Sequence, residues 1–209
     1  MKSVLISIQP YWAFLIVARI MGWDISQEKT IEVRKDYPKD KEWNSVTHIY
    51  CSKDRKSFNR IPKQYQPFMK RLLGKVIGSF VCDKIEEFHE HELIPSKKFY
   101  EFEKARLDLF LKESCLSYNE VCDYRRNLPY YKPLYGWHIS DLKIYDKPKE
   151  LGEFFVKGDC ENFDFCYRCK YYYRGDAFSE AAGIESGCTL YDDLKSLYRP
   201  PQSWCYVEE

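Results

Sequence analysis

Short stretches in which apolar and polar residues alternate recur along the chain and predict β-strands. The pattern is strict in KTIEVR, residues 29–34, where Ile31 and Val33 fall on one face and Glu32 and Arg34 on the other. Similar alternation, or a run of β-branched residues, predicts further strands at 4–8, 47–51, 74–82, 134–145 and 203–207.

Three segments show helical patterns instead. Residues 11–21 are apolar almost all round and follow Pro10, which predicts a buried helix that ends near Gly22. Apolar residues recur at helical spacing in 98–112, and the S-x-x-E pattern that starts at Ser117 predicts a further short helix. Many short strands with one early buried helix are typical of a small β-barrel, so we expect an α+β fold with flanking helices.

The chain has 209 residues, which suits one domain with elaborations. We interpret residues 1–209 as a single domain with three insertions, namely a basic loop at 53–75, a helical insertion at 93–133 and a Cys-rich excursion at 158–190. The third insertion shows no regular hydrophobic period, so something other than an apolar core should hold it together.

Composition narrows the class of protein. A formal net charge of +1 excludes polyanion binding through overall charge, so any nucleic-acid surface must be local. The apolar stretch at 11–23 contains Arg19 and is too short to span a bilayer, and we find no secretory signal. We therefore expect a protein of the reducing cytoplasm, not attached to membranes, whose nine cysteines are thiols or metal ligands.

Four of the cysteines have spacing typical of a metal site. Cys160, Cys166 and Cys169 form a C-x5-C-x2-C pattern, and Cys188 follows after eighteen residues. Four thiolates suit a tetrahedral zinc ion and leave no open position, so the predicted zinc is structural. The alternative is a loop in which reduced thiols happen to cluster.

The basic loop at 53–75 contains eight basic residues and one acid, with Phe58, Tyr65 and Phe68 between them. Cations that neutralise phosphates and rings that stack on bases would suit a single-stranded nucleic acid. The alternative is a solvated loop whose charge is balanced by the acidic stretch 83–92.

A resemblance to a known family begins at residues 27–34, directly after the predicted first helix. ASCH-domain proteins carry G-x-K-x-x-E-x-R there, and this chain keeps Lys29, Glu32 and Arg34 while Gln27 replaces the glycine. The preceding SIQP is similar to the S-I-x-P that opens the same helix in the family. Two later blocks, YGWHIS and PPQSWCYV, resemble a subgroup found in phages and Gram-positive bacteria.

The resemblance covers roughly residues 1–85, 134–156 and 199–209. It implies a PUA-like barrel with a ligand-sized cleft and a role in RNA or nucleotide biology. One bacterial branch of the family is an amidohydrolase that removes the acetyl group from N4-acetylcytidine with a lysine, a threonine and a distant glutamate. Lys29 matches that lysine, whereas Glu32 stands where that branch has its threonine.

The chemistry of the strand at 29–34 can be read directly from its residues. Glu32 and Arg34 are two apart, so both side chains leave the same face. A carboxylate accepts from an exocyclic amine of a base, and a guanidinium binds a phosphate. Lys29 must lie at the strand end to reach the same cleft. The alternative for Glu32 and Arg34 is a weak surface ion pair.

Four more residues are candidates for the cleft. Trp137 would stack on a base, and His138 would serve as a hydrogen-bonding group or a general acid/base. Strand alternation places one of these two in the core. Gln202 and Ser203 follow a stiff Pro-Pro pair and would form a polar rim, although a plain terminal turn is the alternative.

Three functions remain open. The first is a binding module for RNA or a modified nucleotide, read by Glu32 and Arg34. The second is a hydrolase of a modified nucleoside, with Lys29, Glu32 and His138 as its polar set and Glu32 as the base. The third is a phage-type interaction factor that engages a protein partner through 158–190.

Overall fold

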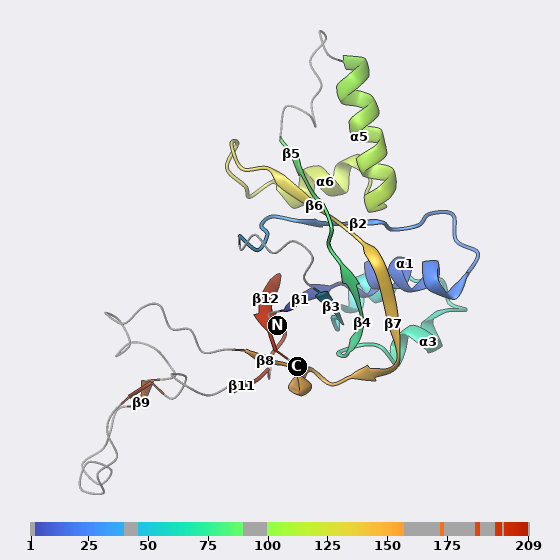
Figure 1. Cartoon of the computed structure of the whole chain (residues 1–209). Helices are drawn as coiled ribbons and strands as arrows, with labels where there is room; N and C mark the ends of the chain where they lie inside the picture. Colours follow the sequence, from blue (N-terminus) through green and yellow to red (C-terminus); the bar gives the residue numbers. More distant parts are fainter. Residues whose placement is uncertain are drawn as a thin grey trace, which may run out of the picture.

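The chain has a mixed α+β fold built on a larger and a smaller sheet (Figure 1). The computed structural model describes residues 3–39, 46–89, 100–156, 172–173, 187–188, 195–197 and 199–208. The larger sheet has the strand order β12-β1-β3-β4-β7, with bounds Trp204–Val207, Ser3–Ile8, Val46–Cys51, Val76–Val81 and Ser140–Lys149. The smaller sheet has the order β2-β6-β5, with bounds Ile31–Arg34, Leu134–His138 and Ile85–Phe88.

The two sheets are joined where the chain passes twice from one to the other. Only Ile139 separates β6 from β7, and residues 82–84 separate β4 from β5 (Figure 1). The strand predicted over 134–145, with a bend near Ser140 and Asp141, is two strands, because the chain bends at Ile139 and continues in the other sheet. Within the described residues no strand pairing joins the edge strands β12 and β7, so a closed barrel is not shown.

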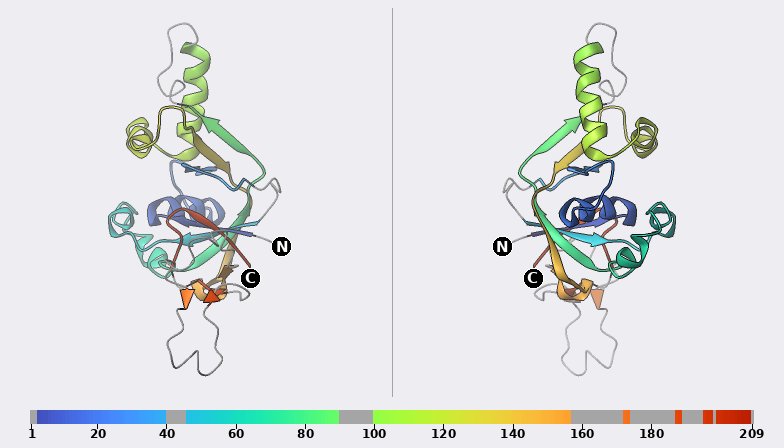
Figure 2. Two further views of the ribbon diagram at one scale, coloured as in Figure 1. Left: turned by 90° about the vertical axis from the view of Figure 1, so that its left-hand side faces the viewer. Right: turned by 90° about the vertical axis from the view of Figure 1, so that its right-hand side faces the viewer.

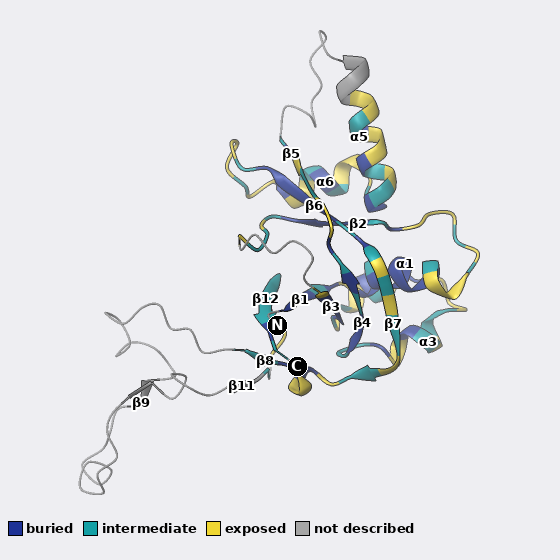
Figure 3. Cartoon of the chain, viewed as in Figure 1, coloured by how far each residue is buried: buried dark blue, intermediate teal, exposed yellow. Residues whose placement is uncertain are grey.

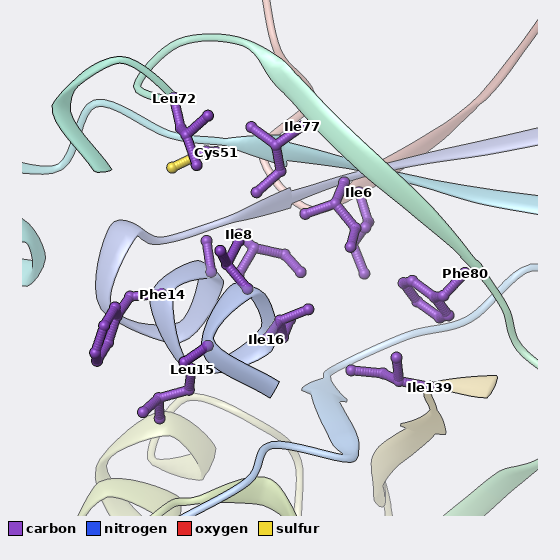
Figure 4. Close-up of a cluster of buried hydrophobic side chains, with 14 of the residues drawn as sticks. Ile6, Ile8, Phe14, Leu15, Ile16, Cys51, Leu72, Ile77, Phe80 and Ile139 are labelled. Atoms are coloured by element: carbon purple, nitrogen blue, oxygen red, sulfur yellow. The ribbon is translucent and has the colours of Figure 1, made fainter. Parts of the chain in front are cut away.

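Helix α1, Pro10–Met21, lies between the two sheets (Figure 2). Pro10 opens it, and Gly22 ends it with φ of 62°, a left-handed conformation that glycine adopts without a Cβ clash. Its apolar side chains, including Phe14 and Ile16, pack with residues of β1, β3 and β4 (Figure 4). Burying one such side chain contributes about 1.5–3 kcal/mol, so this helix anchors the core.

The remaining helices come from the two predicted insertions that the structure describes. Helices α2 and α3, Arg55–Phe58 and Gln66–Lys70, form the basic loop, while α5 and α6, Tyr100–Ser114 and Tyr118–Arg125, form the helical insertion. Ser117 caps α6 in the predicted capping box with Glu120. The 3-10 turn η1 spans Leu151–Glu153. Strand β8, Phe155–Val156, pairs with β11, Lys195–Ser196. Strand β9, Tyr172–Tyr173, pairs with β10, Gly187–Cys188.

The aromatic residues of the basic loop are partly buried and pack against the core. Tyr65 stacks on Trp23 with ring centroids 4.5 Å apart, and Phe68 meets the same indole edge-on. Phe58 also packs against the core. The apolar surface of three rings is worth more inside the core than exposed beside the cations, so the loop turns its charges outward and its rings inward.

Strand β2 of the smaller sheet is buried on both faces. Ile31 and Val33 pack with Phe110 of α5 and Val121 of α6, so the helical insertion covers this face. All four residues of β2 are buried, including Glu32 (Figure 3). The polar face of β2 is thus also shielded from solvent. The prediction that Ile31 and Val33 share a face is confirmed.

Part of the predicted metal site lies outside the described residues. Cys160, Cys166 and Cys169 fall there, and Cys188 lies in β10, whose side chains are not described. In the part of the chain that the structure describes, no group of three or more His, Cys, Asp or Glu side chains is placed to hold a metal. No described helix is both long and apolar enough to cross a membrane.

Candidate ligand-binding pocket

A cavity of about 830 Å³ lies against the polar face of β2. Six parts of the chain line it: the end of β1 with the start of α1, the strand β2 with Lys29 before it, the turn between β3 and α2, Arg60 after α2, helix α6 with Leu116 before it, and residues 200–202. Pockets for small organic ligands typically measure about 300–1,000 Å³, so this cavity has room for a nucleoside-sized molecule.

Lys29, Glu32 and Arg34 come together on one wall of this cavity. Lys29 Nζ lies 3.3 Å from Glu32 Oε2, and Arg34 Nη2 lies 3.0 Å from Glu32 Oε1, so the carboxylate sits between two cations. The three residues are only 1%, 6% and 6% exposed. Buried charges are retained only when they are paired, and here each one is.

Lys29 is fixed by the C-terminus of α5. Its ammonium donates to the carbonyl oxygens of Ile31 and Ser114, both at 2.8 Å, and also forms the ion pair with Glu32. The Thr30 amide also donates to the Glu113 carbonyl oxygen at 2.9 Å. A cation at the carbonyl end of a helix is favoured by the helix dipole, so α5 determines where Lys29 lies.

Arg34 is held by a second backbone contact. Its Nη2 donates to the carbonyl oxygen of Ser7 at 2.5 Å, which ties β2 of the small sheet to β1 of the large one. Its Nε faces no acceptor among the described residues. The guanidinium is therefore positioned by Glu32 and Ser7 and retains an unused donor.

Several polar atoms around the cavity lack a protein partner within the described residues. They are Ser7 Oγ, Ser52 Oγ, Glu32 Oε2 and Arg34 Nε, all on residues that line the cavity. Glu32 Oε2 contacts Lys29 but without hydrogen-bond geometry. A buried polar atom left unpaired costs about 1–3 kcal/mol, so a ligand that pairs with these atoms recovers that cost.

The rim of the cavity joins the basic loop to the helical insertion. Arg60 lies over the rings of Tyr11 and Trp12, with its guanidinium carbon 4.1 and 4.8 Å from their centroids. Its Nη2 is 2.9 Å from Glu120 Oε1 at the start of α6. Trp12 also faces Lys29, whose Nζ is 5.3 Å from the ring centroid. An aromatic surface backed by cations thus borders the cavity.

Two side chains that line the cavity, those of Glu120 and Tyr124, have shifted pKa values. Burial raises the pKa of Glu120, but hydrogen bonds from the Ser117 amide and hydroxyl and from Arg60 outweigh it, so the pKa is lowered overall. Burial raises the pKa of Tyr124, with Arg34 lowering it and Glu32 raising it. Tyr124 as a whole is 36% exposed, yet its hydroxyl is close enough to both charges to respond to them.

Trp137 and His138 do not line the cavity, contrary to expectation. Trp137 pairs with Glu32 in the strand register and shares its face, but it is 1% exposed and belongs to the core. His138 pairs with Ile31 on the opposite face, where its Nε2 lies 3.5 Å from Glu86 Oε1. Alternation correctly separated the two side chains, but the space beside Trp137 is filled by other apolar groups, including Trp204.

The predicted rim pair is divided as well. Gln202 is exposed and lines the cavity directly after Pro200 and Pro201. Ser203 does not line it, and its carbonyl oxygen accepts from the Ser7 amide at 2.9 Å. The Pro-Pro pair therefore presents one polar side chain to the cavity, and the next residue begins the pairing with β1.

Sequence reasoning missed several lining residues. Trp12 was assigned to a helix that was expected to be wholly buried, and Tyr124 and Asp123 lie in an insertion outside the family resemblance. The SIQP segment was a usable signal, because Ser7 and Gln9 both line the cavity.

Among known proteins, only solved structures resemble this chain. No family model and no curated protein matches the chain. Three crystal structures of the ASCH protein from Zymomonas mobilis, two of them of mutant proteins, resemble this structure at 14–15% sequence identity with TM-scores of 0.47–0.49. The matches cover 99–100% of this chain and 88–92% of those chains. The residues of the cavity, rather than this likeness, are the basis for a function.

Proposed function

We propose that the chain is a PUA-like binding module that accepts RNA or a modified nucleotide in the cavity beside β2. The observation that carries this proposal is the buried row of Lys29, Glu32 and Arg34 on the wall of a cavity of about 830 Å³. Burying charged groups carries a desolvation cost, and apolar residues in their place are often at least as stable, so a charged row kept on a cavity wall suits a polar ligand. The resemblance of residues 27–34 to ASCH domains supports the same class of ligand.

The unused atoms of the row suit the edge of a nucleobase. Glu32 Oε2 accepts no hydrogen bond and Arg34 Nε donates none among the described residues, and the two atoms lie on neighbouring side chains of β2. Cytosine and adenine each present an exocyclic amine as a donor, and a carboxylate is a usual partner of the cytosine amine. We therefore expect the base edge to pair with Glu32 and Arg34.

Stacking would come from the rim rather than from Trp137. Trp12 and Tyr124 line the cavity and carry exposed or partly exposed rings. Stacking of a base on an aromatic ring contributes about 1–3 kcal/mol and depends little on base identity. Recognition would thus combine a specific polar wall with a tolerant aromatic rim.

Calorimetric titration with nucleosides tests the proposal. The panel includes cytidine, adenosine and their N-acylated forms, with uridine as a base that lacks the exocyclic amine. Glu32→Gln removes the charge with little change of shape and should weaken binding by roughly tenfold, the equivalent of about 1.4 kcal/mol. The matched control is Glu87→Gln, at a half-exposed glutamate of β5 away from the cavity lining. Failure of every nucleoside to bind the folded protein would reject the proposal.

Hydrolysis of a modified nucleoside is the second candidate, and one observation favours it. Glu32 Oε2 carries no hydrogen bond and borders the cavity, so it can accept a proton from a water molecule. Lys29 is held by two backbone carbonyl oxygens and acts on this route by positioning Glu32 through their ion pair. Chromatographic detection of product from N4-acetylcytidine, lost in Glu32→Gln and kept in Glu87→Gln, would establish turnover. Binding of that nucleoside without product would favour the binding module.

A further inference from the structure

A strongly basic surface covers helices α2 and α3 beside the cavity. Its side chains, which we call the basic face, are exposed and come from one short part of the chain: Lys53, Arg55, Lys56, Arg60, Lys63, Lys70 and Arg71. The one acid of this segment is Asp54, whose Oδ1 accepts from the Ser57 amide at 2.6 Å and thereby caps α2. The cations are therefore not balanced locally.

The packing of the segment turns these cations outward. Ile61, Met69 and Leu72 are buried, and the aromatic rings between them pack on the core. Each apolar residue that faces inward leaves its charged neighbours on the solvent side, in two helices of only four and five residues. The basic face is thus a consequence of how the segment anchors itself to the core.

Most of the basic face has no ion-pair partner within the described residues. Arg60 pairs with Glu120, and Arg71 lies over the ring of Phe68, but the lysines and Arg55 pair with no acid there. In the acidic stretch predicted to neutralise them, Glu86 contacts Lys84 and His138, and Glu87 contacts His89. Unpaired cations clustered on one face create a local positive potential that attracts polyanions.

The cavity itself is a poor place for a chain of phosphates. Its lining carries four carboxylates, Glu32, Asp54, Glu120 and Asp123, against three cations. Arg60 belongs to both surfaces, because it lines the cavity and stands at the edge of the basic face. Lys53 and Arg55 flank the lining residue Asp54 in the chain, so a ligand with one base in the cavity lies beside unpaired positive charges of the basic face.

We propose that the basic face binds the sugar–phosphate backbone of a single-stranded RNA, one nucleotide of which occupies the cavity. The inference rests on the proposed function and extends it, since it identifies the ligand as a strand rather than a free nucleoside. Backbone contacts would supply affinity in a salt-dependent way, while Glu32 and Arg34 would read the inserted base. An acidic protein partner is the competing occupant of the same charges.

Fluorescence anisotropy with a labelled RNA of about 12 nucleotides, a length within the site sizes of single-strand-binding folds, tests the proposal. The test variant is Lys56→Glu with Lys63→Glu, two exposed residues outside the cavity lining. The control is Lys143→Glu with Lys147→Glu, which makes the same charge change at exposed positions of β7. Thermal unfolding verifies that both variants fold.

We expect the test variant to bind the RNA about tenfold more weakly and the control to bind it as the parent does. The slope of log affinity against log salt should fall by about 1.4, roughly 0.7 for each phosphate that the variant no longer neutralises. Titration with a nucleoside should be unchanged in both variants. Glu32→Gln should weaken both RNA and nucleoside binding.

Other outcomes separate the two proposals. RNA affinity no higher than nucleoside affinity, or equal in the test and control variants, would overturn the strand proposal and leave the pocket intact. RNA binding that needs the basic face but is unchanged by Glu32→Gln would also overturn it, because the strand would not enter the cavity. Binding of a poly-glutamate peptide, with no RNA binding, would assign the face to an acidic protein and reject RNA.

Discussion

Lys29 Nζ lies 3.3 Å from Glu32 Oε2, with both side chains almost fully buried. The two residues are three apart, so they reach each other only because Lys29 precedes β2 and is drawn to the end of α5 by the Ser114 carbonyl. The helical insertion therefore determines the geometry of a site whose residues lie in another part of the chain. The stability of the core and the shape of the cavity are coupled at this point.

Replacement of Lys29 by methionine should destabilise the fold. The change removes two charge-assisted hydrogen bonds to backbone carbonyls, each worth about 1.5–3 kcal/mol, and relieves part of the cost of burying the ammonium. We expect a net loss of about 2–4 kcal/mol in the free energy of unfolding, measured with urea. Lys112→Met, at an exposed position of α5, is the control. A double-mutant cycle with Glu32→Gln should give a coupling energy of about 0.5–3 kcal/mol, and additivity would contradict a direct Lys29–Glu32 interaction.

The capping carboxylate of α6 should make stability depend on pH. The folded protein lowers the pKa of Glu120, so its stabilising contribution is complete above the ordinary pKa of a glutamate, about 4.3, and is lost as the pH falls through the lowered value. Glu120→Gln should therefore be less stable than the parent at neutral pH. The difference in the free energy of unfolding should shrink as the pH falls and the carboxylate of Glu120 becomes protonated. Urea unfolding at several pH values measures this difference. A difference that stays constant with pH would show that Glu120 acts through its shape and not its charge.

Neighbouring arginines at the end of α6 should differ greatly in their importance. Arg125 is 5% exposed, and its guanidinium donates to the carbonyl oxygens of Pro129, Tyr130 and Lys132. Arg125→Ala should cost about 3 kcal/mol, because the loop carbonyls lose their donors and a cavity remains. Arg126→Ala, at a side chain that is 75% exposed, should cost less than about 0.5 kcal/mol. Equal losses from the two changes would mean that the loop is not held by Arg125.

Buried thiols should resist alkylation in the folded protein. Burial raises the pKa of Cys51 and of Cys82 to about 12 and that of Cys205 to about 11, so almost no thiolate forms at neutral pH. Cys122 is only partly buried. Treatment with iodoacetamide followed by peptide mass spectrometry should label Cys122 ahead of Cys51 and Cys82, and urea should abolish the difference. Rapid native labelling of Cys51 would contradict its burial.

The zinc site predicted from Cys160, Cys166, Cys169 and Cys188 remains a proposal. Protein purified without chelators should contain about one zinc ion per chain by elemental analysis, because four thiolates bind it as a closed tetrahedral site. Cys166→Ser should release the metal, whereas Cys122→Ser, which changes a cysteine outside this set, should retain it. A metal-free parent protein would favour the reduced-loop interpretation.

Local pattern predicted the elements well where a single periodicity was present. Strict alternation located β2 and separated Ile31 from Glu32, and the capping box located the start of α6 at Ser117. Strand β5 was missed, since Glu86 and Glu87 read as a solvated acidic stretch. Pairing with β6 provides the hydrogen bonds that this segment lacks on its own, so tertiary context outweighs its low β-propensity.

The cavity was only partly predictable for a different reason. Periodicity tells which face of a strand a side chain leaves, but not whether that face meets a cavity or other side chains. Glu32 and Trp137 share a face, yet one lines the cavity and the other is core. The partner of Lys29 lies 85 positions away at Ser114, a separation that no local pattern encodes.

Strand β12 pairs with β1 at the far end of the chain, Ser3 opposite Val207, and residues 200–202 line the cavity just before it. During synthesis, one wall of the cavity is therefore missing until residues 200–207 have left the ribosome. Such a distant contact closes late, since a long loop must be ordered before it forms. A nascent chain would hold Lys29, Glu32 and Arg34 in an incomplete cavity. It would bind the ligand fully only after this region had been translated.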